Sequence, residues 1–388
     1  MIRAAIITFF GLHAFALKDH SSIPLKEYGM IMAHDAASGY LSTARPIKGE
    51  VYDWTQTQTF PNTLASDLLS CGARSFDWRP AMVDSVLKAH HGDVTIDHAF
   101  SDSLDEILDW AAENVDELVL MHIWDCTSDG SADCGAAVLE ELASKNVAVL
   151  DDCGKLTNAT VGEVKALASA SEAAGLVLAL FPSTDSGQGC SEANYDESIA
   201  CWGTKSFSAD VRRADESTGE VMACIEGHGV DLEALYKTLP REDRDAVQDC
   251  VDKYDPSGSS VSPHDVSALF TYSCWDSSSS KSTPLDQMTT YMDMVSQKGP
   301  GQGDAPLYQM QALWEESTAS VVIGELHLSS LVNDEVQSKL NALTAYYIAS
   351  GRFSNINYVE VNNVCDGGQN LLAALNDFND KHPLAVEI

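Results

Sequence analysis

The chain has 388 residues, 45% of them hydrophobic, which excludes a disordered protein and allows one large domain or two ordinary ones. Lysine and arginine total 23 against 58 aspartates and glutamates, so the formal net charge is −35. A field of that sign repels polyanions, so we expect no nucleic-acid partner and no tight binding to anionic membrane surfaces.

The first residues have the pattern of a secretory signal peptide. Arg3 precedes an apolar run, and Ala14-Phe15-Ala16 has the small residues of a cleavage site. We predict a signal peptide over residues 1–16 and a secreted mature protein; the alternative is a buried N-terminal helix. No later apolar run approaches the roughly 18 residues that a membrane helix needs, so we expect no transmembrane segment and a soluble mature protein.

The ten cysteines fit disulfides in an oxidising compartment better than a metal site, because no C-x-x-C pair occurs. Cys126 with Cys134 and Cys190 with Cys201 are close enough in sequence for local bridges, although sequence alone leaves the connectivity open. Asn158-Ala159-Thr160 is an N-glycosylation sequon, which matters only in a host that glycosylates its exports.

Short apolar runs alternate with helical patterns in the first half of the chain. The expected strands are Gly29–Ala33, Arg74–Trp78, Val86–Ala89, Leu118–Trp124 and Gly175–Phe181. Ser103 and Glu106 have the spacing of a capping box and predict a helix that begins at Ser103. A further helix is expected at about 161–174. Strand, helix, strand units of this kind predict a parallel sheet.

The character of the chain changes at about residues 183–300, which are rich in serine, glycine, aspartate and cysteine and predict a disulfide-pinned insertion. Alternation then returns, with expected strands at Ala319–Gly324 and Ile356–Val361 and helices at Asn333–Ile348 and Gln369–Phe378. We therefore predict an α/β fold: a distorted TIM-type (β/α) barrel over residues 17–388, with a Cys-rich insertion in its second half.

Ionisable residues follow three of the predicted strands. His34 and Asp35 follow the first, Asp77 and Arg79 end the second, and His90 and His91 end the third. In a parallel barrel these strand ends meet at one rim. A base, an acid and a cation are what in-line phosphoryl transfer requires. Each signal alone has a plainer reading: a hydrogen-bonded structural histidine, a simple ion pair, or a strand histidine that faces outward.

Three segments resemble the X region of the phosphatidylinositol-specific phospholipase C superfamily, especially its bacterial-type, metal-independent members. They are "MAHDAASGY", "CGARSFDWRPAM" and "LKAHHGDV", within residues 28–125. The resemblance implies a distorted β/α barrel of the phospholipase C-like phosphodiesterase kind. It also implies attack by the inositol 2-hydroxyl on phosphorus, a cyclic phosphodiester product, and neither metal nor other cofactor.

The same resemblance implies roles for individual residues. His34 matches the general base, Arg79 the group that stabilises the pentacoordinate phosphorus, and His91 the general acid. Asp35 and Asp77 match the aspartates that orient and charge-balance His91 and Arg79.

Two departures from the family pattern concern the later strands. The family places a carboxylate behind the base on the last strand, and Glu360 is assigned here to holding His34 in its working tautomer, with Asp366 as the alternative. The inositol-binding lysine of the bacterial enzymes, near the end of strand four, has no counterpart here; His122 or Asp125 could line the pocket instead, or be structural.

The leading prediction is a secreted phosphodiesterase of phospholipase C type that acts on an inositol phospholipid or a related soluble phosphodiester. One alternative is a metal-dependent phosphodiesterase on the same barrel, such as a glycerophosphodiesterase or a sphingomyelinase D-like lipase. The other is a non-catalytic secreted binding protein. The oligomeric state is left open.

Overall fold

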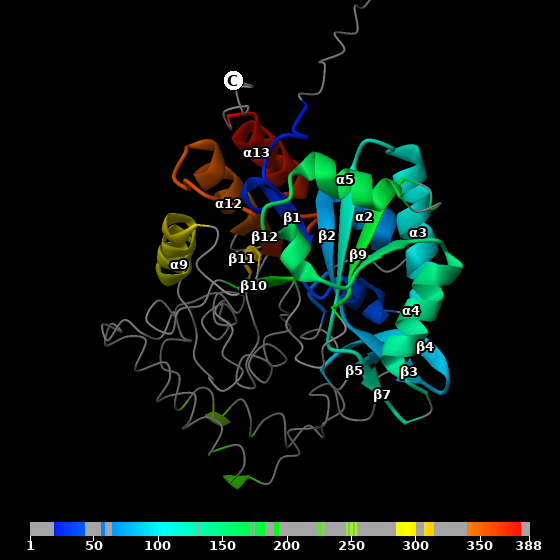
Figure 1. Ribbon diagram of the computed structural model, residues 1–388. Coiled ribbons are helices and arrows are strands. Elements are labelled where there is room, and N and C mark those ends of the chain that lie inside the picture. The colour runs from blue at the N-terminus through cyan, green and yellow to red at the C-terminus, as the bar shows by residue number, and fades with distance from the viewer. Residues whose placement is uncertain are drawn as a thin grey trace, which may run out of the picture.

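The computed structural model describes residues 19–42, 56–58, 64–92, 94–130, 132–170, 173, 175–182, 190–193, 285–299, 306–313 and 340–381, with isolated residues between 224 and 253. Figure 1 shows a central sheet with helices packed around it. The predicted signal peptide, the Ala319–Gly324 strand, Cys201 and most of the predicted insertion lie outside the described residues.

The main sheet has eight strands, in the order β10-β11-β12-β1-β2-β6-β9-β8. They are β1 (Met30–Ala33), β2 (Ala73–Trp78), β6 (Leu118–Ile123), β8 (Ala148–Leu150), β9 (Leu176–Leu180), β10 (Ser191–Ala193), β11 (Leu307–Gln311) and β12 (Tyr358–Val361). All neighbouring pairs run parallel. The carboxyl ends of β12, β1, β2 and β6 therefore lie together at one edge.

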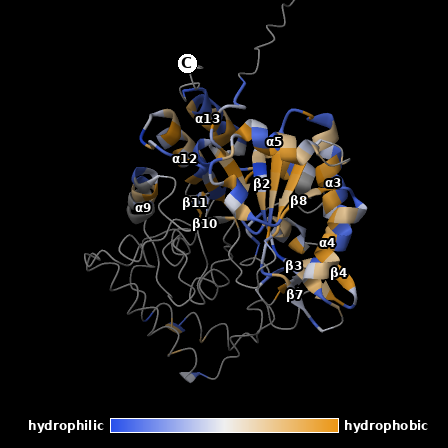
Figure 2. Cartoon of the chain, viewed as in Figure 1, coloured by the Kyte–Doolittle hydropathy of each residue, from blue (hydrophilic) through white to orange (hydrophobic). Residues whose placement is uncertain are grey.

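The central strands are buried on both faces, which explains their continuous apolar sequences. All residues of β1 and β6 are buried. Alternate residues of β1 enter different clusters: Ile31 packs with the surrounding helices, whereas Met30 packs with Leu120, Leu178 and Tyr358 on the opposite face. Figure 2 shows these hydrophobic strands in orange and hydrophilic residues on the outer surface of the helices.

The helices are α2 (Leu64–Cys71), α3 (Phe100–Glu113), α4 (Cys134–Ser144), α5 (Val161–Ser169), α9 (Leu285–Lys298), α12 (Leu340–Ala349) and α13 (Gly368–Asp380). The predicted capping box at Ser103 is wrong, because α3 begins at Phe100 and Ser103 is buried within it. The buried Phe100 starts the helix three residues before Ser103. The side chain of Glu106 does not cap the helix but accepts a hydrogen bond from the Tyr40 hydroxyl at 2.8 Å. A capping box does occur at the start of α5, between Thr160 and Glu163.

Four disulfides join described cysteines: Cys71–Cys365, Cys126–Cys134, Cys153–Cys190 and Cys224–Cys250. The predicted Cys126–Cys134 bridge is confirmed, whereas the predicted Cys190–Cys201 bridge is wrong. Cys153 follows β8 and Cys190 precedes β10, so this bond joins the two edge strands of the sheet, with a Cα–Cα distance of 5.0 Å. Sequence proximity could not reveal it, because the curvature of the sheet brings its edges together.

The third predicted strand does not belong to the parallel sheet, which corrects the expectation for His90 and His91. It is β4 (Val86–His91) of a second sheet with β3 (Pro80–Val83), β5 (Val94–Ile96) and β7 (Thr127–Ser128), and it runs antiparallel to β3 and β5. Asp84 and Ser85 both have positive φ, at 52° and 62°, as a two-residue hairpin turn requires. The hairpin folds β4 back beside the end of β2.

Two described elements fall within the range of the predicted insertion. β10 pairs with β11 in the main sheet, and α9 packs close to β11. The boundaries of the insertion stay a prediction. In the described part of the chain, no helix is both long and apolar enough to cross a membrane.

Candidate active site

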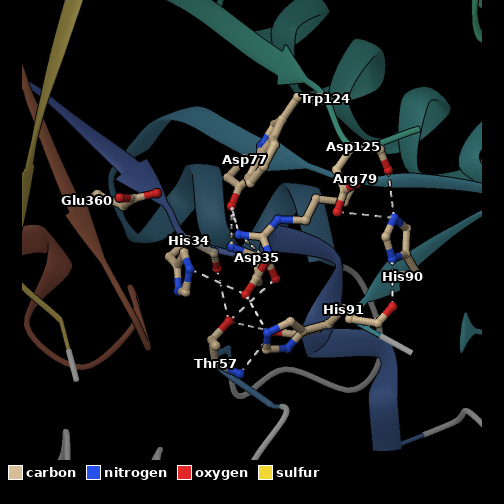
Figure 3. A network of polar contacts seen from close by, with 12 residues as sticks. His34, Asp35, Thr57, Asp77, Arg79, His90, His91, Trp124, Asp125 and Glu360 are labelled. Atoms are coloured by element: carbon tan, nitrogen blue, oxygen red, sulfur yellow. Dashed lines mark hydrogen bonds and ion pairs between the residues drawn. The ribbon is translucent and has the colours of Figure 1, made fainter. Parts of the chain in front are cut away.

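Asp35, directly after β1, is the centre of a buried cluster of charged side chains (Figure 3). Its Oδ1 lies 2.9 Å from Nη2 of Arg79, and its Oδ2 lies 3.0 Å from Nε2 of His91 and 3.4 Å from Nε2 of His34. The residue has φ of 40°, which turns the chain sharply at the strand end. One carboxylate therefore contacts a guanidinium and two imidazoles.

Arg79 follows β2 and is held by two carboxylates and an indole. Its Nη2 donates a hydrogen bond to Oδ2 of Asp77 at 2.9 Å, in addition to the ion pair with Asp35. The guanidinium lies over the ring of Trp124, 4.4 Å from its centroid, and the indole N–H donates to Asp77. The predicted ion pair between Asp77 and Arg79 is present, and Trp124 is a member of the cluster that sequence reasoning missed.

His90 and His91 face in different directions, as strand alternation predicts. His91 points toward Asp35, and its side chain is 13% exposed. The ring nitrogens of His90 instead lie 2.9 Å from the carbonyl oxygen of Gly92 and 2.7 Å from that of Asp125. His90 thus ties the hairpin to the end of β6 while His91 enters the cluster from the second sheet.

His34 is hydrogen-bonded to Asn362, a partner that the sequence did not predict. Its Nδ1 lies 2.9 Å from Oδ1 of Asn362, just beyond β12. Glu360 accepts a hydrogen bond from Gln311 at 3.0 Å, and one of its carboxylate oxygens lies within 4.8 Å of a ring nitrogen of His34. Its predicted role of holding the His34 tautomer stays a prediction. Asn362 and Glu360 lie two residues apart, so they face the same side of the strand and both lie next to His34. Asp366, the alternative, accepts a hydrogen bond from Asn341 through its carbonyl oxygen.

Thr57 and Gln58 hold the main chain of His34 in place. Thr57 Oγ1 donates to the His34 carbonyl oxygen at 3.0 Å, and Gln58 Nε2 donates to the same oxygen at 2.9 Å. Gln58 also donates to the Val361 carbonyl oxygen and so joins β1 to β12. These buried hydrogen bonds fix the backbone of His34 and so the position from which its imidazole extends.

The two predicted substrate-binding residues, His122 and Asp125, differ in how far they are exposed. His122 is 2% exposed, bonds through Nε2 to the Tyr358 hydroxyl at 3.0 Å, and meets that ring edge to face. Burial lowers the pKa of His122 to about 3, so the ring is neutral. Asp125 follows β6, and its side chain is 48% exposed near the site.

Burial acts on the carboxyls of Asp35 and Glu360 with opposite outcomes. Burial alone would raise the pKa of Asp35, but the charges of Arg79, His34 and His91 outweigh it and hold that pKa well below its usual range. For Glu360, burial dominates over the attraction of His34 and raises the pKa to about 7. Asp35 is thus a permanent anion, and Glu360 binds a proton through most of the acidic range.

Two groups of possible metal ligands occur among the described residues. Cys224 and Cys250 of the first group, which includes His228, form a disulfide. The second group is His34, Asp77 and Glu360, whose ligand atoms lie within 4.8 Å of one another. Asp77 already binds the guanidinium of Arg79, whose charge opposes a divalent cation at the same place.

The structure resembles solved structures of a known phospholipase. A Staphylococcus aureus phosphatidylinositol-specific phospholipase C that incorporates pentafluoro-Phe aligns at a TM-score of 0.50 and 13% identity, covering 93% of this chain and 95% of that chain. Another structure of the S. aureus enzyme, from work on its membrane binding, gives a TM-score of 0.48 and 14% identity over 92% of this chain and 94% of that chain. No family model and no curated protein matched the sequence. The chain therefore has a phosphatidylinositol-specific phospholipase C-like α/β fold.

Proposed function

We propose that the protein is a phosphodiesterase of phospholipase C type that cleaves its substrate by attack of a neighbouring hydroxyl group. The observation that carries the proposal is the convergence of two imidazoles and one guanidinium on the carboxylate of Asp35. General acid and base groups beside a fixed cation are the requirements of in-line displacement at phosphorus.

His34 acts as the base. Because Oδ1 of Asn362 can only accept a hydrogen bond, Nδ1 of His34 carries the proton and Nε2 is the basic nitrogen. Nε2 takes the proton of the attacking hydroxyl as the new P–O bond forms. Arg79 stabilises the charge on the equatorial oxygens, and Asp77 and Asp35 hold its guanidinium.

His91 acts as the acid. It gives its proton to the leaving alkoxide as the bond from phosphorus to that oxygen breaks, which produces a cyclic phosphodiester and a neutral alcohol. The carboxylate of Asp35, 3.0 Å from Nε2 of His91, holds the ring toward the site.

An inositol phospholipid, or a related diester with a hydroxyl next to the phosphate, is the substrate class that this chemistry fits. The net charge of −35 opposes tight binding to anionic bilayers, so a soluble, glycosylated or locally presented substrate is favoured. Asp125, at the end of β6, is a candidate contact for a sugar hydroxyl. The disulfides support an extracellular location.

Phosphorus NMR of the reaction with phosphatidylinositol tests the proposal. We expect a cyclic phosphate with the wild type and a rate at least about 100-fold lower for His34→Ala and for His91→Ala. His20→Ala is the control, because His20 pairs with Asp380 near the opposite end of β1. Unchanged activity of either site variant would refute the assignment. Loss of wild-type turnover in EDTA would favour the metal-dependent alternative.

Substitutions of Trp124 test its role as a positioning residue for Arg79. Trp124→Phe keeps a ring under the guanidinium but removes the N–H that bonds to Asp77, and we expect kcat to fall about tenfold. Trp124→Leu removes both contacts, and we expect a fall of about 100-fold. The readout is the rate ratio between the phosphate and its phosphorothioate at a non-bridging oxygen. A merely structural role would lower both rates equally and leave this ratio unchanged.

A further inference from the structure

Asn158 lies in an exposed turn whose main chain is held firmly. The turn joins the short helix η3 (Cys153–Leu156) to α5, and Asn158 itself is exposed. The carbonyl oxygen of Ala159 accepts a hydrogen bond from the Leu25 amide at 2.8 Å, and the Ala159 amide donates to Leu156. The side chain of Asn158 therefore leaves the surface at a fixed place.

Asn158 is one of the residues that line a surface groove of about 520 Å³. Its lining combines apolar and polar side chains: Ala159, Ala166 and Leu167 on α5 and the turn, with Lys155 and Glu163. Leu167 is 39% exposed and is one of the large hydrophobic residues that the described surface leaves open to water. The volume is in the range that holds a small ligand, and an apolar floor with polar neighbours suits the face of a sugar ring.

We propose that Asn158 carries an N-linked glycan whose first N-acetylglucosamine residue packs in this groove against Leu167. The donor is a polyprenyl diphosphate-linked oligosaccharide. A C–N bond forms between Nδ2 of Asn158 and the anomeric carbon, the bond from that carbon to the diphosphate oxygen breaks, and the amide loses one proton. The occupant of the groove is then part of the same molecule, so this proposal does not depend on the proposed phosphodiesterase activity.

The contacts of Thr160 indicate that the glycan is added before the chain folds. Thr160 is the third residue of the sequon and also the N-cap of α5: its hydroxyl accepts from the Glu163 amide and donates to the Glu163 carboxylate, both at 3.2 Å. The hydroxyl that a transferase must recognise is thus engaged in the folded protein. Transfer therefore occurs on the unfolded chain as it enters the secretory pathway, before the Cys153–Cys190 bond and α5 form.

Expression of the full chain, with its predicted signal peptide, in a eukaryotic secretory host tests the attachment. We expect peptide mass mapping to find a glycan on Asn158, to lose it in Asn158→Gln, and to retain it in Thr160→Ser, which keeps both the sequon and the helix cap. Unmodified Asn158 in the wild type, whether secreted or retained in the cell, would overturn the proposal.

A second measurement tests the groove. The glycan is trimmed enzymatically to its first N-acetylglucosamine, and the Tm of this form is compared with that of Asn158→Gln. We expect the single sugar to raise the Tm by about 2 °C, and Leu167→Ser to remove this increment. An equal increment in the Leu167→Ser background would show that the sugar does not pack there.

Discussion

Replacing Asp35 by asparagine is expected to lower kcat/KM by about 10⁴-fold, the size of effect seen when an aspartate that orients a catalytic histidine becomes an amide. The effect is expected to be large because the Asp35 carboxylate contacts several side chains of the site. The carboxylate pairs with Arg79 at 2.9 Å and His91 at 3.0 Å, and lies 3.4 Å from His34. An amide removes the charge that pairs with Arg79 and holds His91, and it presents an N–H group to cations.

Asp125→Asn is the matched control for Asp35→Asn. Asp125 also follows a strand of the main sheet and also has positive φ, at 51°, but its side chain is 48% exposed. We expect at most about a tenfold loss of kcat/KM, because an exposed carboxylate contributes little beyond a single substrate contact. Similar losses in the two variants would contradict the central role of Asp35. The Tm of each variant separates a catalytic effect from a loss of folded protein.

The sequence predicted most of the residues that meet in the site because strand ends in a parallel sheet are set by local patterns. Apolar runs predicted β1 and β2 to within a residue or so, and the polar groups at their carboxyl ends, His34 and Asp77, therefore lie at the same edge. His91 also lies in the site, although its strand belongs to the second sheet and not to the parallel sheet. The alternation of a strand is the same in either direction, so the prediction that one of the two histidines points inward survived the change from parallel to antiparallel pairing.

The hairpin that carries His91 could not be predicted from local sequence. Its turn is Asp84-Ser85, whereas the usual signal for two successive residues of positive φ is Asn-Gly or Asp-Gly. Bonds from other parts of the chain stabilise this turn instead. The amide of Asp84 donates to the Asp129 carboxylate at 2.9 Å, a contact between residues 45 positions apart.

Asn362 and Trp124 were missed for a related reason. Neither residue type marks a site by itself, and each acquires its place only through the register between distant strands. The contact between His34 and Asn362 spans 328 positions, and Trp124 meets Asp77 because β6 lies beside β2. In the β1–β12 register Glu360 lies opposite Met32, and Asn362 follows two residues later beside His34.

Backbone conformation marks the same edge of the sheet. Asp35 follows β1, Asp125 lies two residues beyond β6, and Asn363 lies two beyond β12, and all have positive φ, between 40° and 51°. Non-glycine residues adopt this conformation at an energetic cost, and such residues gather at functional sites. Hydrogen bonds maintain it here: the Asp35 amide donates to Asp77, and the Asn363 amide donates to the Thr57 carbonyl oxygen at 2.7 Å.

The burial of Glu360 has a consequence for stability. Burial raises the pKa of its carboxyl from 4.5 to about 7 in the folded protein. Between these two pH values the folded state binds more protons than the unfolded state, so the free energy of unfolding falls as the pH rises. Above about pH 7 the loss is complete and constant. Each unit of pKa corresponds to 1.36 kcal/mol, so the whole loss is about 3 kcal/mol.

Glu360→Gln is therefore expected to be more stable than the wild type by about 3 kcal/mol at pH 8 and about equally stable at pH 4. Glutamine has the shape of the protonated acid, and its carbonyl oxygen can keep the hydrogen bond from Gln311. The measurement is urea unfolding of both proteins from pH 4 to pH 8, with Glu140→Gln on the exposed surface of α4 as the control. A constant difference between Glu360→Gln and the wild type across this range would mean that the carboxyl has the same pKa in the folded and unfolded states, so that it is ionised in the folded protein above about pH 5. Since a buried anion beside Asp77 would then need a partner, that result would also reopen the question of a cation bound between Glu360, Asp77 and His34.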